Sequence, residues 1–205
     1  YEVAHLAYEV ERQDLALAGG KQDQYAAAFG GFNFMEFHAG DRVIVNPLRM
    51  KDWVLAELEA SLLLYFTGVS RESARIIDEQ SRNAERGAAG ALDAMHALKR
   101  EAVQMKEALL RGDLRAFAAT LQQGWEAKKR MASSISNPMI DALEATARAH
   151  GATATKVSGA GGGGFMMFAC DPVDRIRLAR ALQGEGGRLL DFHFNPAGAV
   201  AWRVP

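Results

Sequence analysis

A run of glycines, Gly159-Ala160-Gly161-Gly162-Gly163-Gly164, constrains the fold of this chain more than any other stretch. Five glycines in six positions leave almost no side chain to bury, so the run cannot serve as core. Because glycine lacks a Cβ, its backbone adopts positive φ angles and can bring successive N–H groups close to an anion. The run therefore predicts a phosphate-binding loop.

The elements on either side of the run decide which kind of loop it is. The run matches the pattern G-x-G-x-x-G, but a dinucleotide site needs a strand before the loop and a helix after it. Here the sequence predicts a strand at Thr153–Val157 and a second short apolar strand at Phe165–Ala169. No Gly-Lys-Ser/Thr follows, which argues against the P-loop of NTPases. We predict a strand, a glycine loop and a strand; a flexible linker is the alternative, although linkers seldom lie between two apolar strands.

The composition excludes several classes of protein. The chain has 205 residues, 49% hydrophobic and 24% charged, which is typical of a globular protein of one or two domains. A net charge of −1 provides no attraction for nucleic acid or for an anionic membrane, and no apolar run approaches the roughly 20 residues of a membrane span. The single cysteine, Cys170, excludes an internal disulfide framework and fits a reducing compartment, so we expect a cytoplasmic protein with a buried thiol.

Periodicity and turn residues predict the elements of the chain in order. The pattern β, helices, β, β, α, β, β from residue 61 onward favours an α+β fold in which helices cover an antiparallel sheet. The predicted helices are 1–17, 21–31, 53–59, 70–87, 91–111, 113–134, 138–151 and 172–182. The predicted strands are 32–38 with 42–47 as a hairpin, a buried strand at 61–67, the two strands beside the glycine run, and a closing pair at 188–194 and 199–204.

Asp23 is the carboxylate best placed for chemistry. It lies between Gln22 and Gln24, just after Gly19-Gly20, at the start of a predicted short helix whose N-terminal dipole favours the ionised form. A rigidly held, ionised carboxylate can accept or orient a hydroxyl proton. A helix cap is the alternative role for an aspartate at this place. The five histidines lack ligand-like spacing, so we expect no protein-held zinc.

Three separated segments of the chain resemble the GHMP family of small-molecule kinases, and the resemblance extends over essentially the whole chain. The glycine run points to the family, whereas the segments around Asp23 and at 67–71 resemble its sugar kinases and, among these, the D-glycero-D-manno-heptose 7-phosphate kinases. The matching segments are residues 19–25 with 29–33, residues 65–71 and residues 156–165, and the Ser-Asn-Pro run at 136–138 adds to them.

The resemblance implies ATP-dependent phosphoryl transfer, with Mg²⁺, to a sugar hydroxyl, namely the anomeric hydroxyl of a heptose 7-phosphate. It implies that Asp23 is the catalytic carboxylate. Such transfer needs positioning and charge stabilisation more than covalent chemistry, and backbone N–H groups provide both. The residues that match the family's loop beside the nucleotide phosphates are Ser158, Gly159, Ala160, Gly161, Gly162 and Gly163.

Candidates for binding the phosphosugar lie in three places. Gly20 and Gln24 flank the carboxylate, and Ser70 and Arg71 open a helix, where backbone N–H groups and a guanidinium can hold an anion. The basic cluster 128–130 is the third. The alternative role for Ser70 and Arg71 is a solvated helix cap, and the alternative role for the cluster 128–130 is a charged helix face. The sequence carries no indication of oligomeric state.

One element of the family is not found in these 205 residues: an N-terminal Pro-x-x-x-Gly-Leu-Gly-Ser-Ser-like phosphate loop. We therefore expect the C-terminal part of a kinase, with little or no ATP turnover by itself. In this interpretation residues 1–60 end an N-terminal catalytic domain, and residues 61–205 form a ferredoxin-like C-terminal domain with a helical insertion. Another sugar kinase of the family, for fucose or galactose, and a non-catalytic relative that binds sugar or nucleotide are the alternatives.

Overall fold

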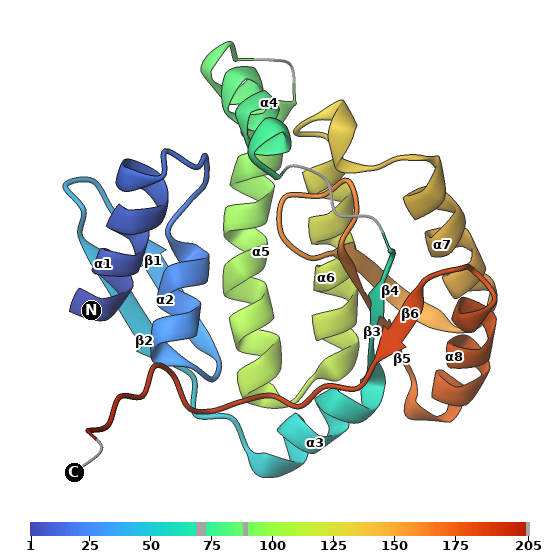
Figure 1. Cartoon of the computed structure of the whole chain (residues 1–205). Coiled ribbons are helices and arrows are strands. Elements are labelled where there is room, and N and C mark those ends of the chain that lie inside the picture. The colour runs from blue at the N-terminus through green and yellow to red at the C-terminus, as the bar shows by residue number, and fades with distance from the viewer. Residues whose placement is uncertain (69–72, 88–89, 204–205) are drawn as a thin grey trace. The chain divides into compact units, whose positions relative to one another are not determined.

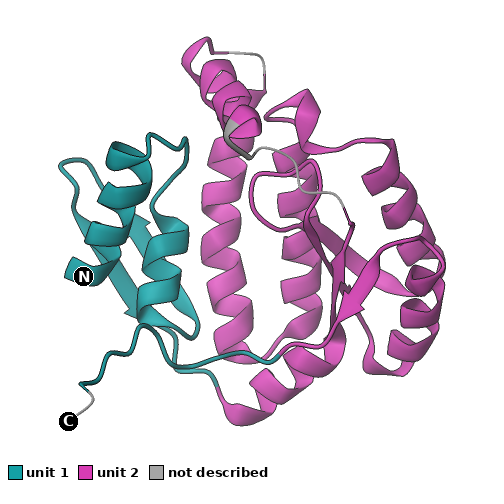
Figure 2. Cartoon of the chain, viewed as in Figure 1, with its two compact units in different colours: residues 1–50, 193–205 teal, residues 51–192 magenta. Residues whose placement is uncertain are grey.

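Helices and antiparallel strands make up two compact units of the chain (Figure 1). The structure is a computed structural model that describes residues 1–68, 73–87 and 90–203. Unit 1 comprises residues 1–50 and 193–205, and unit 2 comprises residues 51–192 (Figure 2). The predicted α+β class is confirmed, and the assignment of 1–60 and 61–205 to two family domains stays a prediction. Within the described ranges, no helix is long and apolar enough to span a lipid bilayer.

Unit 1 consists of two helices and a hairpin. Helix α1 (Glu2–Glu9) continues into a π-helical turn at Val10–Asp14, and α2 (Gln22–Phe29) ends at Gly30. Strands β1 (Asn33–Phe37) and β2 (Val43–Pro47) pair antiparallel, so the predicted helices and hairpin are confirmed. The small core of the unit contains Ala4, Tyr25 and Val45, one from each of α1, α2 and β2.

The end of the chain corrects one prediction. The strand predicted at 199–204 is not formed by residues 199–203, and the strand predicted at 188–194 is only β6 (Arg188–Leu190). Instead, the N–H of Ala199 donates to the carbonyl of Ala28 at 3.0 Å, next to the end of α2. A Cβ on Gly198 would lie 2.1 Å from that same carbonyl oxygen. Close backbone packing on α2 therefore replaces the local hairpin that the turn residues suggested.

Unit 2 is built on a four-stranded antiparallel sheet in the order β4-β5-β3-β6. Its other strands are β3 (Leu62–Phe66), β4 (Ala152–Val157) and β5 (Phe165–Cys170), all close to their predicted ranges. With helices inserted between β3 and β4 and another between β5 and β6, the element order is that of a ferredoxin-like domain.

Six helices belong to unit 2, counted over the residues that the structure describes. The helix predicted at 113–134 stops earlier, and residues 133–135 form a separate 3₁₀ turn. Asp113 and Asn137 cap α6 and α7 by accepting backbone N–H bonds. The helices are α3 (Asp52–Ser61), α4 (Ser73–Glu85), α5 (Ala91–Arg111), α6 (Leu114–Lys129), α7 (Pro138–Ala149) and α8 (Arg175–Gln183).

The main core lies between one face of the sheet and helices α7 and α8, and Figure 1 shows α5 and α6 on the other side of the sheet. Tyr65 pairs with Met166 across β3 and β5, so both side chains point to the same face. Cys170 is buried, which raises the pKa of its thiol and confirms the predicted buried cysteine. Fully buried partners from the helices are Ile140, Leu143, Leu178 and Leu182.

A buried carboxylate, Glu144, ties α7 to α6. Glu144 is 8% exposed and accepts from Trp125 Nε1 at 3.0 Å and from Arg148 Nη2 at 2.7 Å. Burial by itself would raise the pKa of Glu144, but these hydrogen bonds and the charge of Lys129 outweigh it and hold the pKa below its usual value. Gln122, which donates to the same carboxylate, also accepts the backbone N–H of Thr155 and so covers the edge of β4.

We expect Glu144→Gln to lower the free energy of unfolding at pH 7 by about 1–3 kcal/mol, because a charged acceptor of several donors is lost. The folded pKa is depressed, so this contribution is present above the ordinary value of 4.5 and disappears as the pH falls through the folded pKa. Urea unfolding at pH 7 and pH 3.5 should therefore show the variant closer to the unmodified protein at the lower pH. Glu126→Gln, a more exposed carboxylate of α6, is the control. Equal losses at both pH values would contradict the prediction.

Candidate functional site

The glycine loop joins β4 to β5 in unit 2, as predicted, and packs closely on the segment before α7. Gly161 has φ +120°, and a Cβ placed on it would lie 2.9 Å from both the Cα and the carbonyl oxygen of Ile135. That same oxygen accepts the N–H of Gly162 at 2.8 Å. A side chain at position 161 would therefore push the loop off its support as well as strain its backbone.

Donors from four separate segments hold the carbonyl groups of the loop. The ends of β3 and α6 contribute, and so do α4 and the cap of α7. The pairs are Lys128 Nζ to Gly159 O, Gln80 Nε2 to Ala160 O (3.2 Å), Asn137 Nδ2 to Gly162 O (3.1 Å) and Thr67 N to Gly164 O (2.9 Å). Because four of the six carbonyl groups of residues 159–164 have a donor, these four backbone oxygens are held in place.

The N–H groups of the loop are arranged differently from its carbonyls. Those of Gly162 and Gly164 donate to Ile135 and to Thr67, but four others have no acceptor among residues 1–68, 73–87 and 90–203. The four belong to Gly159, Ala160, Gly161 and Gly163. A loop in which four of six oxygens have donors and four of six N–H groups have no acceptor within the described residues is suited to bind an anion. Ser158 to Gly163, the set predicted from the sequence, thus lies in this one loop, and its binding of phosphate stays a prediction.

The basic cluster 128–130 is divided by the fold. Lys128 contacts the loop, whereas Lys129 lies 3.1 Å from Glu126 and 5.5 Å from the centre of the Trp125 ring. Arg130 donates to the carbonyl of Glu126 on its own helix. Lys128 is therefore the member of the cluster at the loop, and the other two stabilise α6. Ser70 and Arg71, the other candidates for phosphate binding, lie outside the described residues.

Two ionisable side chains near the loop were missed by the sequence analysis. Lys156 precedes the loop by two residues, and burial lowers the pKa of its ammonium group although Glu101 counteracts this. Burial raises the pKa of Glu101, whose Oε2 atom has no hydrogen-bond partner in the described part of the chain. They are 55 positions apart on β4 and α5, so no local spacing could have linked them.

Asp23 lies in the first turn of α2 in unit 1, and its side chain is exposed. The capping position is taken by Lys21, and within the described residues Asp23 accepts no backbone hydrogen bond, which argues against the cap as its role. It lines a cavity of about 270 Å³ between α1, α2 and Ala199. A carboxylate that stabilises no element and faces a cavity is available to a ligand.

The neighbours of Asp23 form a polar cluster with the first helical segment. Gln24 is 5% exposed; its Nε2 donates to Glu11 Oε2 at 2.7 Å, while its Oε1 has no donor in the described residues. The carbonyl of Gly20 accepts from Arg12 Nε at 3.2 Å. The sequence showed Glu11 and Arg12 only as interleaved charges of a helix, so it offered no sign of these contacts.

The predicted site residues thus belong to both units. Asp23, Gly20 and Gln24 lie in unit 1, and the glycine loop with Lys128 lies in unit 2, so their action in one pocket stays a prediction. Over the described ranges, no group of three or more histidine, cysteine or acidic side chains is placed to hold a metal ion.

Comparison with known proteins places this geometry in context. Residues 105–188 match the family model described as GHMP kinases C terminal. The chain is 48% identical over 204 residues to the D-glycero-alpha-D-manno-heptose 7-phosphate kinase of Campylobacter jejuni, covering all of this chain and 60% of that protein. It is 29% identical over 176 residues to the L-fucokinase/L-fucose-1-P guanylyltransferase of Bacteroides fragilis, covering 84% of this chain and 18% of that protein.

Solved structures agree with the sequence comparison. A D-glycero-D-manno-heptose 1-phosphate kinase from Bacteroides thetaiotaomicron has a TM-score of 0.76 and 42% identity, with 98% of this chain and 55% of that chain covered. The mevalonate kinase of L. major, at 19% identity and a TM-score of 0.72 over 89% of this chain and 54% of that chain, shares the fold. The chain therefore spans little more than half the length of the two heptose kinases that it resembles.

Proposed function

We propose that the protein containing this chain is a sugar kinase of the GHMP family, because residues 105–188 match the family model of its C-terminal domain. In this proposal it transfers the terminal phosphate of ATP to the anomeric hydroxyl of D-glycero-D-manno-heptose 7-phosphate. The observation that carries the proposal is the glycine loop, in which four of the six carbonyl groups have donors while four N–H groups have no acceptor within the described residues. The 48% identity to a heptose 7-phosphate kinase supports the choice of acceptor.

The residues of the loop fit the phosphate groups of a nucleotide. Unpaired N–H groups attract phosphate oxygens, and the ammonium group of Lys128 lies beside the loop to add a full positive charge. Bound ATP with Mg²⁺ supplies the phosphoryl group in an electrophilic, charge-compensated form. The role of the chain's own loop is to hold those oxygens in place, because phosphoryl transfer depends mainly on positioning and electrostatics.

Asp23 is proposed to act on the sugar. Its carboxylate holds the acceptor hydroxyl and accepts the proton that this hydroxyl loses when its oxygen bonds to phosphorus. The side chain of Gln24, which lines the same cavity as Asp23, and the backbone at Gly20 are proposed to bind the remaining sugar hydroxyls. Ser70, Arg71 and Lys128 are the proposed contacts of the 7-phosphate and the nucleotide phosphates. A cytoplasmic location remains a prediction from the single cysteine.

The test is ADP release by a protein in which this chain is joined to the N-terminal phosphate loop of the family. We expect ATP turnover with D-glycero-D-manno-heptose 7-phosphate, with a product phosphorylated at the anomeric carbon by ³¹P NMR, and little with the heptose that lacks the 7-phosphate. The 205-residue chain alone serves as the control and should show little or no turnover. Equal turnover with L-fucose or D-galactose would indicate another sugar kinase, and binding without turnover of any sugar would indicate a non-catalytic relative.

A further inference from the structure

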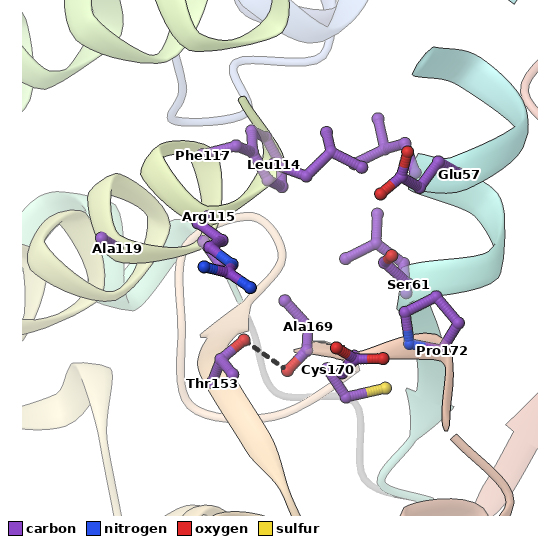
Figure 3. A pocket seen from close by; sticks show the side chains of 14 residues that line it. Glu57, Ser61, Leu114, Arg115, Phe117, Ala119, Thr153, Ala169, Cys170 and Pro172 are labelled. Carbon is purple, nitrogen blue, oxygen red and sulfur yellow. Dashed lines mark hydrogen bonds between the residues drawn. The ribbon is translucent and has the colours of Figure 1, made fainter. Parts of the chain in front are cut away.

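A second cavity lies in unit 2, at the end of the sheet opposite the glycine loop (Figure 3). Its volume is about 360 Å³, and it is bounded by α3, the beginning of α6 and the ends of β3, β4 and β5. A volume of this size is typical of small-molecule sites. The floor is apolar and includes Leu58, Leu62, Phe117 and Ala169.

The course of the strands separates this cavity from the loop. Strand β5 begins at Phe165, directly after the loop, and reaches Cys170 at the cavity five residues later. At about 3.3 Å per residue, the two ends are roughly 17 Å apart. Strand β3 likewise begins with Leu62 at the cavity and leads to Thr67, which holds the loop. A molecule in the cavity would therefore leave residues 158–164 uncovered.

Polar groups without partners line the cavity. Ser61 is only 9% exposed, and its hydroxyl has no hydrogen-bond partner within the described residues. The guanidinium of Arg115, on α6, likewise has no ion-pair partner in that part of the chain. Figure 3 shows the side chains of Ser61 and Arg115 on opposite sides of the cavity. Polar groups that lack protein partners at an apolar cavity are the usual means by which a site orients a ligand.

Charge and shape define the kind of ligand. Arg115 offers a forked set of N–H donors suited to a carboxylate or phosphate, and the floor beside it is apolar. Glu57 lies on the α3 side of the cavity, where a carboxylate favours a hydroxyl or amino donor. Asp171 adds a second carboxylate, which already accepts the N–H of Val173. From Arg115 across the apolar floor to Glu57, the lining therefore fits a ligand with an anionic group at one end, an apolar body and a hydrogen-bond donor at the other end.

We propose that this cavity is a second ligand site, which binds a small organic anion with an apolar body and a hydroxyl or amino group. Arg115 pairs with the anion, Ser61 donates or accepts a hydrogen bond, and Glu57 accepts from the donor group. The site is independent of the proposed kinase function, since it shares no lining residue with the glycine loop or with Asp23.

The test is a ¹⁵N–¹H NMR titration of the 205-residue chain with 4-hydroxybenzoate, which carries all three features. Benzoate, phenol and acetate, each lacking at least one of the three, are titrated in parallel. We expect 4-hydroxybenzoate to shift the amide signals of Ser61, Phe117 and Cys170 and to bind more tightly than the other three. Arg115→Gln should weaken its binding by about tenfold, because the charged hydrogen bonds are lost. Arg180→Gln, which removes an exposed arginine of α8, is the matched control and should bind unchanged.

Several results would overturn the proposal. Signals that shift only at residues 158–164 would assign the anion to the glycine loop instead. Equal affinity for phenol and 4-hydroxybenzoate would remove the role of the anion, and unchanged binding by Arg115→Gln would remove the role of the arginine. Ser61→Ala provides a second variant, expected to weaken binding by a few fold through loss of one neutral hydrogen bond. Unperturbed amide signals of Leu178 and Leu182, core residues of unit 2 that do not line the cavity, report whether each variant is folded.

Discussion

Under the proposed function, replacing Asp23 by asparagine should lower kcat of the phosphoryl transfer by about 10²- to 10⁴-fold, the range expected for loss of a group that takes a proton in the transition state. Asparagine keeps the shape of the side chain but neither accepts the proton nor carries the negative charge. The fold should be unaffected, because Asp23 is exposed and caps no helix in the described structure. Steady-state kinetics on the protein that contains the family's phosphate loop, together with a thermal melt, measures both effects.

Asp14→Asn is the matched control for Asp23→Asn. Asp14 is also an exposed aspartate of unit 1 in a helical segment, but it does not line the cavity at α2. Its replacement should change kcat by less than about twofold, as for a carboxylate remote from the substrate. A similar small effect of Asp23→Asn, with ATP still consumed at the normal rate, would remove Asp23 from the catalytic role and leave the loop as the single proposed element.

Gly161→Ala is expected to destabilise unit 2 by about 1–3 kcal/mol and, under the proposed function, to abolish most nucleotide binding. The added Cβ would lie 2.9 Å from the backbone of Ile135, which cannot move aside as a flexible side chain could. The φ of +120° adds strain for any residue with a Cβ. Because Ile135 also holds Gly162, relief of the clash would displace the unpaired N–H groups of the loop. Urea unfolding and nucleotide titration check the two effects.

Gly159→Ala separates backbone strain from the contact with Ile135. Gly159 also has a positive φ, +77°, but a Cβ there would meet nothing within 4 Å. Its replacement should cost only the left-handed backbone penalty, about 1 kcal/mol. The difference between the two variants therefore measures the close approach at Gly161. Equal losses of stability would show that packing on Ile135 contributes nothing to the loop.

Local sequence patterns accounted for most of the elements. The apolar run at 62–66 and the two strands beside the glycines form β3, β4 and β5. Their formation was predictable because hydrophobic periodicity, β-branched or aromatic side chains and flanking glycines favour a strand through interactions among residues that are near in the sequence. Asp113 and Pro138 marked the starts of two helices for the same reason. The strand predicted at 199–204 was wrong because its backbone partner is Ala28, which is more than 170 positions away.

For the candidate site, too, the sequence predicted some features and only the tertiary structure revealed the others. Spacing singled out Asp23 and the glycine run, but not the contact of Lys128 with Gly159 or that of Gln24 with Glu11. Lys128 and Lys129 are neighbours in the sequence, yet one holds the loop and the other joins the Glu144 network. Adjacent residues of a helix point about 100° apart, so only the packing of α6 decides which of them faces the loop.

The amino-acid sequence by itself determined that this protein has an α+β fold with a bare glycine turn between two strands, since these follow from side-chain periodicity and from the absence of Cβ atoms in one short segment. The tertiary structure alone decided how the turn is held, because the donors to four of its carbonyl groups come from α4, α6, the residue after β3 and the cap of α7, while four of its N–H groups have no acceptor within the described residues. It also created the cavity at Arg115, whose walls come from α3, α6 and three strand ends that meet only when the sheet has formed.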